Sequence, residues 1–224
     1  MIPAFETQPG IFAVTSPKPR WQWWLIWIIP AAVLLGFAFY LDPAVRDWVA
    51  QHQVPAVRTF MRSVSWWGDW PQHVALALIG IGIAYARRNR RWITILVAMI
   101  VACAIAGAIN RVIKIGTGRS RPYVTSDAGW KGLRMSSSYN AFPSGHTAAS
   151  TAFFAALLIA NRRIGLALLL IPMLIAASRM YLNAHHLSDV VAGAIVGVSS
   201  AILAWHLVSK RMPENNSHAE ATSA

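Results

Sequence analysis

Long apolar runs, closed by arginines or short polar stretches, constrain this chain more than any other feature. Of its 224 residues, 56% are hydrophobic and only 12% are charged. That charged fraction is about half of what soluble domains carry. Apolar runs of this length and number are typical of helices that cross a bilayer. The sequence therefore predicts an all-α, multi-pass membrane protein.

We expect six spans in a single membrane domain, residues 21–209. The runs that form them cover about residues 21–41, 70–86, 92–113, 144–160, 164–182 and 190–208. Pro172 is expected to kink the fifth span. Gly193 and Gly197 in the sixth span are four residues apart, a spacing that most often reflects ordinary helix packing. The polar tails, residues 1–20 and 210–224, are expected to be disordered.

The segment between the first two spans mixes apolar residues with arginines and is too polar to cross a membrane. Asp42 and Pro43 are typical of an N-cap and a first helical residue, so a new helix is expected to begin there. The segment is predicted to lie along the membrane surface as one or two amphipathic helices. Trp66, Trp67 and Trp70 would mark the return to the interface.

The basic residues predict which side of the membrane each loop faces. Six spans place both termini on one side, where two short loops carry Arg87, Arg88, Arg90, Arg91, Arg162 and Arg163. The positive-inside rule makes that side cytoplasmic and the opposite loops periplasmic or external, with the protein in a bacterial inner membrane. The formal net charge of +12 suits a nucleic-acid binder too, but the basic residues sit at the ends of apolar runs, so we expect no nucleic-acid partner.

A second basic cluster lies on the predicted outer side, where the positive-inside rule does not explain it. Its members are Lys114, Arg119, Arg121, Lys131, Arg134 and Arg179. An anionic ligand at that face explains such a cluster. For a single arginine the alternative is a side chain reaching for the interface, and we interpret Arg119, Lys131 and Arg134 in that way.

The stretch Pro143-Ser144-Gly145-His146, directly before an apolar run, predicts an anion site at a helix start. Ser144 is a good N-cap residue, and Gly145 allows a ligand to approach the backbone closely. The free N–H groups and the helix dipole would face the anion. His146 would stand beside it in the first turn. The alternative is an ordinary loop before a membrane helix.

His185 and Asp189 are four residues apart and would share one face of a helix. A carboxylate there can hold one imidazole nitrogen and leave the other free, as a histidine nucleophile or base requires. The alternatives are an interfacial loop histidine for His185 and a helix N-cap for Asp189, which could also serve both purposes. An ionised residue beside a span is costly and is functional by default.

The sequence argues against a metal or a cofactor. Between residues 110 and 189 the acids are Asp127 and Asp189 alone, whereas a two-metal phosphatase needs several carboxylates. A three-histidine zinc site of His146, His185 and His186 is the rival. It requires convergence of two adjacent side chains, which point about 100° apart on a helix. The single cysteine, Cys103, allows no disulfide within the chain.

Three motifs in order resemble the type 2 phosphatidic acid phosphatase (PAP2) superfamily, in its membrane lipid phosphatase branch. They are K-x6-R-P at Lys114 to Pro122, P-S-G-H at Pro143 to His146, and S-R-x5-H-x3-D at Ser178 to Asp189. All three match without a gap or a substitution. The resemblance implies a six-span bundle of the PAP2 and haloperoxidase-like type. The haloperoxidases themselves are soluble, which this apolar chain excludes.

The resemblance also implies roles for the matching residues. His185 would attack phosphorus, Asp189 would orient it, and His146 would protonate the leaving oxygen and later activate water. The phosphate oxygens would be held by Lys114, Arg121, Ser144, Gly145 and Arg179. Secondary positions are Pro122, Pro143, Ser178 and His186, the last through packing or a ligand contact.

The implied activity is metal-independent hydrolysis of a lipid phosphate or diphosphate taken from the bilayer through an apolar portal. We favour a polyprenyl (undecaprenyl) diphosphate or a broad range of lipid phosphates. A lipid A 1-phosphatase or a phosphatidylglycerol phosphate phosphatase is the alternative, and the loop 123–142 is expected to shape headgroup choice. A phosphotransferase and a non-enzymatic lipid-phosphate binding or transport protein remain as other classes.

Overall fold

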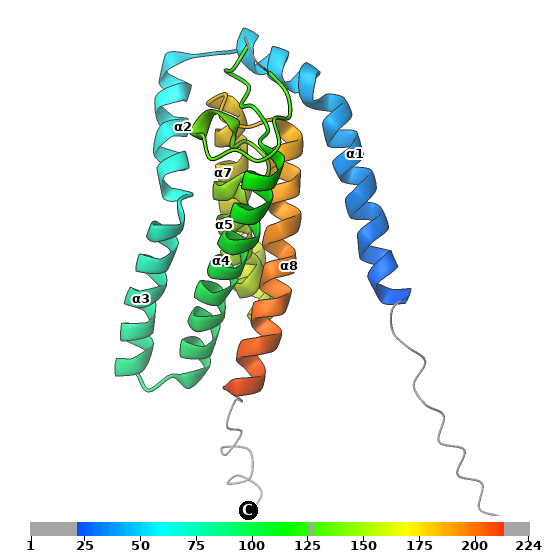
Figure 1. Ribbon diagram of the computed structural model, residues 1–224. Helices are drawn as coiled ribbons and strands as arrows, with labels where there is room; N and C mark the ends of the chain where they lie inside the picture. Colours follow the sequence, from blue (N-terminus) through cyan, green and yellow to red (C-terminus); the bar gives the residue numbers. More distant parts are fainter. Residues whose placement is uncertain (1–21, 126–127, 213–224) are drawn as a thin grey trace, which may run out of the picture.

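The computed structural model describes residues 22–125 and 128–212 (Figure 1). The predicted N-terminal tail, 1–20, and residues 213–224 of the C-terminal tail lie outside this part. The described chain is all-α, as expected. Its helices are α1 (Gln22–Gln51), α2 (Pro55–Trp67), α3 (Trp70–Ala86), α4 (Arg90–Thr117), the 3-10 turn η1 (Ser137–Tyr139), α5 (Gly145–Ala160), α6 (Arg162–Leu168), α7 (Leu170–Tyr181) and α8 (Leu187–Arg211).

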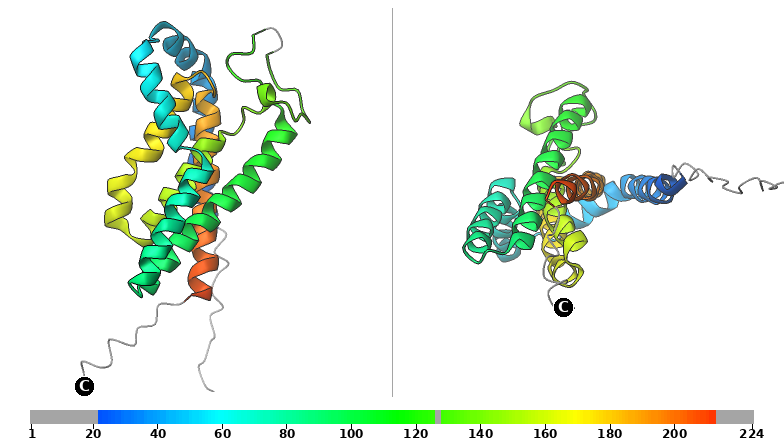
Figure 2. Two further views of the ribbon diagram at one scale, coloured as in Figure 1. Left: turned by 90° about the vertical axis from the view of Figure 1, so that its left-hand side faces the viewer. Right: turned by 90° about the horizontal axis from the view of Figure 1, so that it is seen from below.

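Helix α5 forms the centre of the bundle and packs against α4, α7 and α8. Seen from below, α3 and α1 lie on opposite flanks (Figure 2). Small side chains let the central helices approach closely: a Cβ atom on Gly193 would lie 2.6 Å from the Ser144 carbonyl oxygen, and one on Gly197 would lie 2.8 Å from that of Ala148. The two glycines of α8 therefore serve packing, as predicted.

Four stretches are long and apolar enough to cross a membrane. They are Trp27–Gln51, Arg90–Thr117, Arg162–Tyr181 and Leu187–Arg211. Two of the predicted spans correspond to shorter apolar helices, α3 with 17 residues and α5 with 16. The protein is thus a multi-pass membrane protein.

The predicted helix start at Asp42 is wrong. Helix α1 continues from Gln22 to Gln51 and carries Pro43 in its interior. The Asp42 carboxylate does not cap its own helix, because it accepts the backbone N–H of Ser188 at 2.8 Å, in the first turn of α8. A contact far along the chain has overridden the local helix signal.

One amphipathic helix, α2, follows α1, but it does not lie across the end of the bundle. It runs nearly end to end with α3 along the bundle (Figure 1) and packs against α7. Arg179 of α7 donates a hydrogen bond from Nη1 to the hydroxyl of Ser65. The polar residues of α2 are thus partly directed at a helix of the bundle, which the local pattern did not reveal.

The predicted kink in the fifth span is confirmed. Helix α6 ends at Leu168 and α7 begins at Leu170, a few residues before Pro172. Proline cannot donate to the carbonyl four residues earlier, and its ring clashes with that carbonyl. The interruption therefore falls one turn on the N-terminal side of Pro172.

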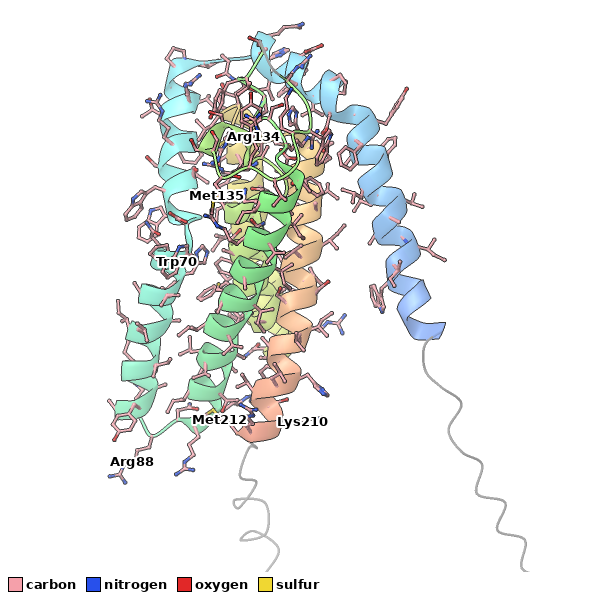
Figure 3. The ribbon with its side chains drawn as sticks, in the orientation of Figure 1. Trp70, Arg88, Arg134, Met135, Lys210 and Met212 are labelled. Carbon is pink, nitrogen blue, oxygen red and sulfur yellow. The ribbon has the colours of Figure 1, made fainter. Side chains whose placement is uncertain are left out.

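The two ends of the bundle differ in the helix ends and loops that meet there. Figure 3 shows Arg88 and Lys210 at the lower end and Arg134 at the upper end. The upper end brings together the last turns of α4 and α7, the first turns of α5 and α8, and the long loop between α4 and α5. All three motifs therefore lie at one end.

Candidate active site

The start of α5 is held in place by neighbouring helices. The carbonyl of Pro143 accepts a hydrogen bond from the side chain of Asn110 at 3.3 Å, and that of Phe142 accepts one from the Thr117 hydroxyl at 3.2 Å. The N–H of Ser144 donates to the Asp189 carbonyl at 2.8 Å. The helix start is thus fixed against both α4 and α8.

Ser144 and Gly145 occupy this start in different ways. Ser144 is the N-cap residue, but its fully buried hydroxyl accepts from Thr147 at 3.0 Å instead of capping the helix. A Cβ atom on Gly145 would meet nothing closer than Asn110 Oδ1 at 3.7 Å and Lys114 Cε at 3.8 Å. Packing alone therefore does not require glycine at position 145, whereas close approach of an anion would.

His185 is placed by a tight turn at the end of α7. The carbonyl of Arg179 accepts the N–H groups of Ala184 at 3.0 Å and His185 at 3.3 Å. Asn183 adopts the left-handed conformation, with φ of 57°, as is common just after a helix. The five residues between Arg179 and His185 are thus the length of this turn, and the turn brings both side chains to one place.

Asp189 faces His185 as its spacing predicts. Asp189 Oδ2 lies 3.6 Å from His185 Nδ1, slightly beyond hydrogen-bond distance, and accepts the backbone N–H of His186 at 2.8 Å. Asp189 therefore caps α8 and faces the imidazole at once. Burial lowers the pKa of His185 to about 3, with a further contribution from Lys114, so the ring is neutral and holds a free lone pair.

The three motif cations have no carboxylate within ion-pair distance in the described parts of the chain. The Lys114 ammonium donates to the Asn140 carbonyl at 2.5 Å, and Arg121 Nε donates to that of Ser137 at 2.9 Å. The Nε atom of Arg179 is buried without a hydrogen-bond partner. For the part-buried Lys114 and Arg179, positive charge without a counter-charge is costly, and an anion would relieve that cost.

The secondary positions are mainly structural. The Ser178 hydroxyl donates to the Ile175 carbonyl of its own helix at 2.6 Å. His186 forms a reciprocal cap with Asp189 at the start of α8. Burial lowers the pKa of His186, and the nearby Arg119 lowers it further. Pro122 and His185 both line a small hollow.

The interpretation of Arg119 as an interfacial residue is wrong. Its guanidinium is buried and bridges two carboxylates: Nη1 lies 2.6 Å from Asp189 Oδ1, and Nη2 lies 2.7 Å from Asp42 Oδ2. Nη1 also donates to the Ser188 hydroxyl at 2.6 Å. The signal that could have revealed this was Asp42, an acid beside an apolar span, to which the argument used for Asp189 applies equally.

A cavity of about 610 Å³ opens beside the start of α5 and the last turns of α4. Lys114, Gly145 and His146 line it together with Asp69 and Arg111. The rest of its wall comes from α3, α4 and α5: Trp70, Val74, Ile100, Cys103, Ala104, Gly107, Asn110 and Ala149. The cavity thus joins a cationic end to an apolar wall within the bundle.

No group of three or more histidine, cysteine or carboxylate side chains within residues 22–125 and 128–212 is placed to hold a metal ion. The carboxylate nearest His185, Asp189, is held by Arg119 and by the α8 backbone. An anionic group at this site would meet the neutral His185, the second histidine His146 and the motif cations.

Comparison with known proteins agrees with this chemistry. Residues 95–213 match the family model described as "PAP2 superfamily". The chain is 34% identical to a decaprenylphosphoryl-5-phosphoribose phosphatase of Mycobacterium tuberculosis over 152 residues, 65% of this chain and 77% of that protein. It is 32% identical to a lipid A 1-phosphatase of Rhizobium johnstonii over 101 residues, 44% of this chain and only 41% of that protein.

Two solved structures share the fold. A transmembrane PAP2-type phosphatidylglycerolphosphate phosphatase from Bacillus subtilis superimposes with a TM-score of 0.63 at 20% identity, covering 87% of this chain and 98% of that one. Aquifex aeolicus LpxE gives a TM-score of 0.52 at 20% identity, covering 74% of this chain and 95% of that one. At these identities the likeness concerns the fold alone.

Proposed function

Because the chain belongs to the PAP2 superfamily of metal-independent membrane lipid phosphatases, we propose that it hydrolyses polyprenyl-linked phosphates or diphosphates through a phosphohistidine on His185. One observation carries this: Lys114, Arg121 and Arg179 lack carboxylate partners in the described residues and belong to the motifs that also supply His146 and His185. A phosphate group supplies the negative charge that these side chains lack.

In the first step His185 attacks phosphorus through the ring nitrogen that does not face Asp189. The bond from phosphorus to the leaving oxygen breaks, and His146 gives that oxygen a proton. Asp189 stabilises the positive charge that develops on the imidazole. The cations and the Gly145 N–H hold the remaining phosphate oxygens, where negative charge gathers in the transition state.

In the second step water replaces the histidine on phosphorus. His146, now without its proton, takes a proton from the attacking water. The bond between phosphorus and His185 breaks, so the ring returns to its neutral form and inorganic phosphate leaves. His146 thereby regains the proton that it gave up in the first step.

The proposed site faces the outside of the membrane, and both termini are cytoplasmic. The lower end of the bundle carries the arginine-rich turn of Arg88 and the end of α8 at Lys210 (Figure 3), the pattern expected of a cytoplasmic face. Trp70 lies at the break between α2 and α3 and is 59% exposed, as suits the membrane interface. In this topology six segments cross the membrane: α1, α3, α4, α5, the pair α6 and α7, and α8.

The apolar wall of the cavity supports a lipid substrate. We place the phosphate against Lys114 and His146, and the first part of the lipid chain along Val74, Ile100 and Gly107. Polyprenyl-linked substrates are favoured because the M. tuberculosis relative, whose name specifies a decaprenylphosphoryl substrate, matches over most of its length. Lipid A is the second candidate, since a lipid A 1-phosphatase matches over part of its length.

Phosphate release by the purified protein tests the proposal. The panel is undecaprenyl diphosphate, undecaprenyl phosphate, phosphatidic acid, phosphatidylglycerol phosphate and lipid A, each with and without an alcohol acceptor. We expect the highest kcat/KM on a polyprenyl substrate. Activity confined to lipid A favours the second candidate, acceptor phosphorylation indicates a transferase, and binding without turnover indicates a carrier.

Chelation tests the metal-free mechanism on the same substrates. Full activity is expected in excess EDTA, together with inhibition by vanadate, which mimics five-coordinate phosphorus bound to histidine. Loss of activity in EDTA, with recovery on adding zinc or magnesium, contradicts a histidine nucleophile acting without a metal.

A further inference from the structure

Arg119 does not belong to the proposed phosphate site, yet its guanidinium is fixed by two carboxylates and a hydroxyl. It bridges Asp42 and Asp189 with both terminal nitrogens. Its guanidinium carbon lies 5.1 Å from the centre of the Phe39 ring and 5.0 Å from that of Trp130. Two carboxylates, one hydroxyl and two aromatic rings thus fix the plane of one side chain.

This arrangement determines which oxygen of Asp189 meets the nucleophile. Arg119 holds Oδ1 at 2.6 Å, and Oδ2 is left to face the His185 ring. The Asp42 carboxylate takes the other arm of Arg119 and also binds the Ser188 hydroxyl at 2.5 Å. The carboxylate that faces His185 is therefore oriented from α1 through Arg119.

The formal charges of this group suit the covalent step. Asp42, Asp189 and Arg119 together carry one negative charge while His185 is neutral. Phosphorylation turns the imidazole into a cation, and that single negative charge then lies beside it. If Arg119 bound Asp189 without Asp42, the pair would be neutral and this compensation would be lost.

We propose that Arg119 and Asp42 form a positioning pair that orients Asp189 toward His185 and tunes its charge for phosphohistidine formation. The inference rests on the proposed function, since it assigns a purpose to the Asp189–His185 contact. Lysine cannot replace Arg119, because one ammonium cannot bridge two carboxylates in a plane while contacting the Phe39 and Trp130 rings. Asp42 extends the site to α1, which contains none of the three motifs.

The first arm of the test is Arg119→Lys, which keeps the charge and removes the planar fork. We expect kcat to fall about 100-fold, as misplacement of a catalytic group by roughly 1 Å does, with KM changed by less than about threefold. Phosphate binding is unaffected, because Lys114, Arg121 and Arg179 remain. A raised KM with unchanged kcat overturns the proposal, since Arg119 would then bind the substrate.

The second arm separates positioning from folding. Arg119→Gln alone leaves two buried carboxylates uncompensated and can fail to fold, so it is combined with Asp42→Asn. The double variant keeps the net charge of the group, and we expect the wild-type melting temperature to be largely restored while kcat stays about 100-fold low. A wild-type kcat in the folded double variant overturns the proposal.

The exposed pair of Arg46 and Asp47, 3.1 Å apart on the next turn of α1, provides matched controls. Arg46→Gln and Asp47→Asn remove the same groups from an exposed ion pair. Both are expected to retain the wild-type kcat, KM and melting temperature, because exposed ion pairs contribute little.

A third measurement does not depend on turnover. In histidine-labelled protein, the ¹⁵N signal of His185, assigned with His185→Gln, should shift in Arg119→Lys and stay unchanged in Asp47→Asn. An unchanged His185 signal in Arg119→Lys overturns the positioning pair. If the wild type releases no phosphate from any lipid, the proposed function fails, and this spectrum alone decides the positioning role.

Discussion

The cations on the two sides of His185 differ in whether carboxylates pair with them. On the α1 side, Arg119 is bound by Asp42 and Asp189 and contacts the Phe39 and Trp130 rings. On the side of the proposed phosphate site, Lys114 binds one backbone carbonyl and Arg179 binds one hydroxyl, and neither meets a carboxylate within ion-pair distance in the described chain. The charges on the first side are paired, whereas on the second side no carboxylate of the described chain pairs with Lys114 or Arg179, although Asp69 lines the cavity wall.

The difference separates cations that hold the structure from cations that await a ligand. A buried cation that is paired with two carboxylates stabilises one geometry of the group. Removing one of those partners leaves an uncompensated charge. A cation that meets only carbonyls or hydroxyls has given up water for partial compensation, which a phosphate completes. Charge balance, rather than burial alone, is therefore the criterion that distinguishes Arg119 from Lys114.

The largest expected effect tests whether the two sides meet at His185. His185→Ala should lower phosphate release to background, a fall of about a million-fold if the residue is the nucleophile, with insertion and folding retained. His52→Ala is the matched control, because His52 is exposed and its ring stacks on Trp48. More than a few per cent of residual release from folded protein would exclude His185 as the nucleophile.

Asp189→Asn should cost less, since it disturbs the orientation and charge of the nucleophile without removing it. The side-chain amide still reaches Arg119, so part of the geometry survives. An equal or larger loss than in His185→Ala would mean that Asp189 takes part directly in the chemistry. The measurement is the same lipid phosphate assay, with melting temperature as the check on folding.

The next expected effect sets the two kinds of cation against each other. Lys114→Met should lower kcat/KM by roughly 100- to 1,000-fold, as loss of one transition-state donor does. Its melting temperature should stay the same or rise, because an unpaired charge leaves the interior. Asp42→Asn should instead destabilise the protein by about 3–5 kcal/mol, since it leaves Arg119 half-paired.

Thermal melting in detergent, with activity measured on the folded fraction, decides between these outcomes. Charge balance would be the wrong criterion if Lys114→Met melted far below the wild type. It would be equally wrong if Asp42→Asn left the melting temperature unchanged.

The sequence predicted the side of the proposed phosphate site far better than the α1 side. Lys114, His146, Arg179 and His185 were assigned to one site because the family resemblance groups their motifs and the predicted topology places those motifs on one side of the membrane. Asp42 is 77 residues from Arg119 and 146 from Ser188, so no local pattern could connect them. The local helix signal at Asp42 and Pro43 even pointed the wrong way, because the tertiary contact defines the role of that carboxylate.

The helix pattern was predictable for a related reason. Apolar runs and arginine clusters reflect the membrane, which acts on each span separately, and Pro172 breaks its helix through its own missing N–H. The orientation of α2 depends on its contact with α7, through Ser65 and Arg179, which the sequence does not show. The positions of the helices, which each apolar run sets alone, were thus predicted, whereas the orientation of α2, which depends on its contact with α7, was not.

A smaller effect is expected from filling the cavity wall. A Cβ atom on Gly107 meets no atom within 4 Å, so Gly107→Leu adds a side chain toward the cavity without straining the fold. We expect kcat/KM for a polyprenyl substrate to fall about tenfold, and that for a short-chain soluble phosphate to change little, because chain contacts contribute about 1–3 kcal/mol per group. Gly82→Leu in α3 is the matched control, since a Cβ atom there also meets nothing within 4 Å and Gly82 does not line the cavity.

Equal losses on long-chain and short-chain substrates would place the lipid chain elsewhere. The same outcome would mean that the apolar wall serves packing, so that only the cationic end of the cavity contacts substrate.

The smallest expected effect is on the pH dependence of kcat/KM at acid pH. It tests whether the cations near His185 alter the pKa of this nucleophile. The nucleophile must be neutral, so activity is lost as the pH falls through its pKa in the free enzyme. A histidine with the ordinary pKa of about 6.5 would cost roughly tenfold in kcat/KM between pH 7.5 and pH 5.5. Burial and the nearby Lys114 lower the pKa of His185 to about 3, so this limb should be missing from that range. The measured kcat/KM is corrected for ionisation of the substrate, which is titrated by ³¹P NMR in the same micelles.

The variant Lys114→Met removes one positive charge that opposes protonation of His185. The pKa of His185 therefore rises, and the acid limb moves to higher pH. A limb near pH 6.5 in the wild type would show that burial and Lys114 do not lower the pKa of the nucleophile.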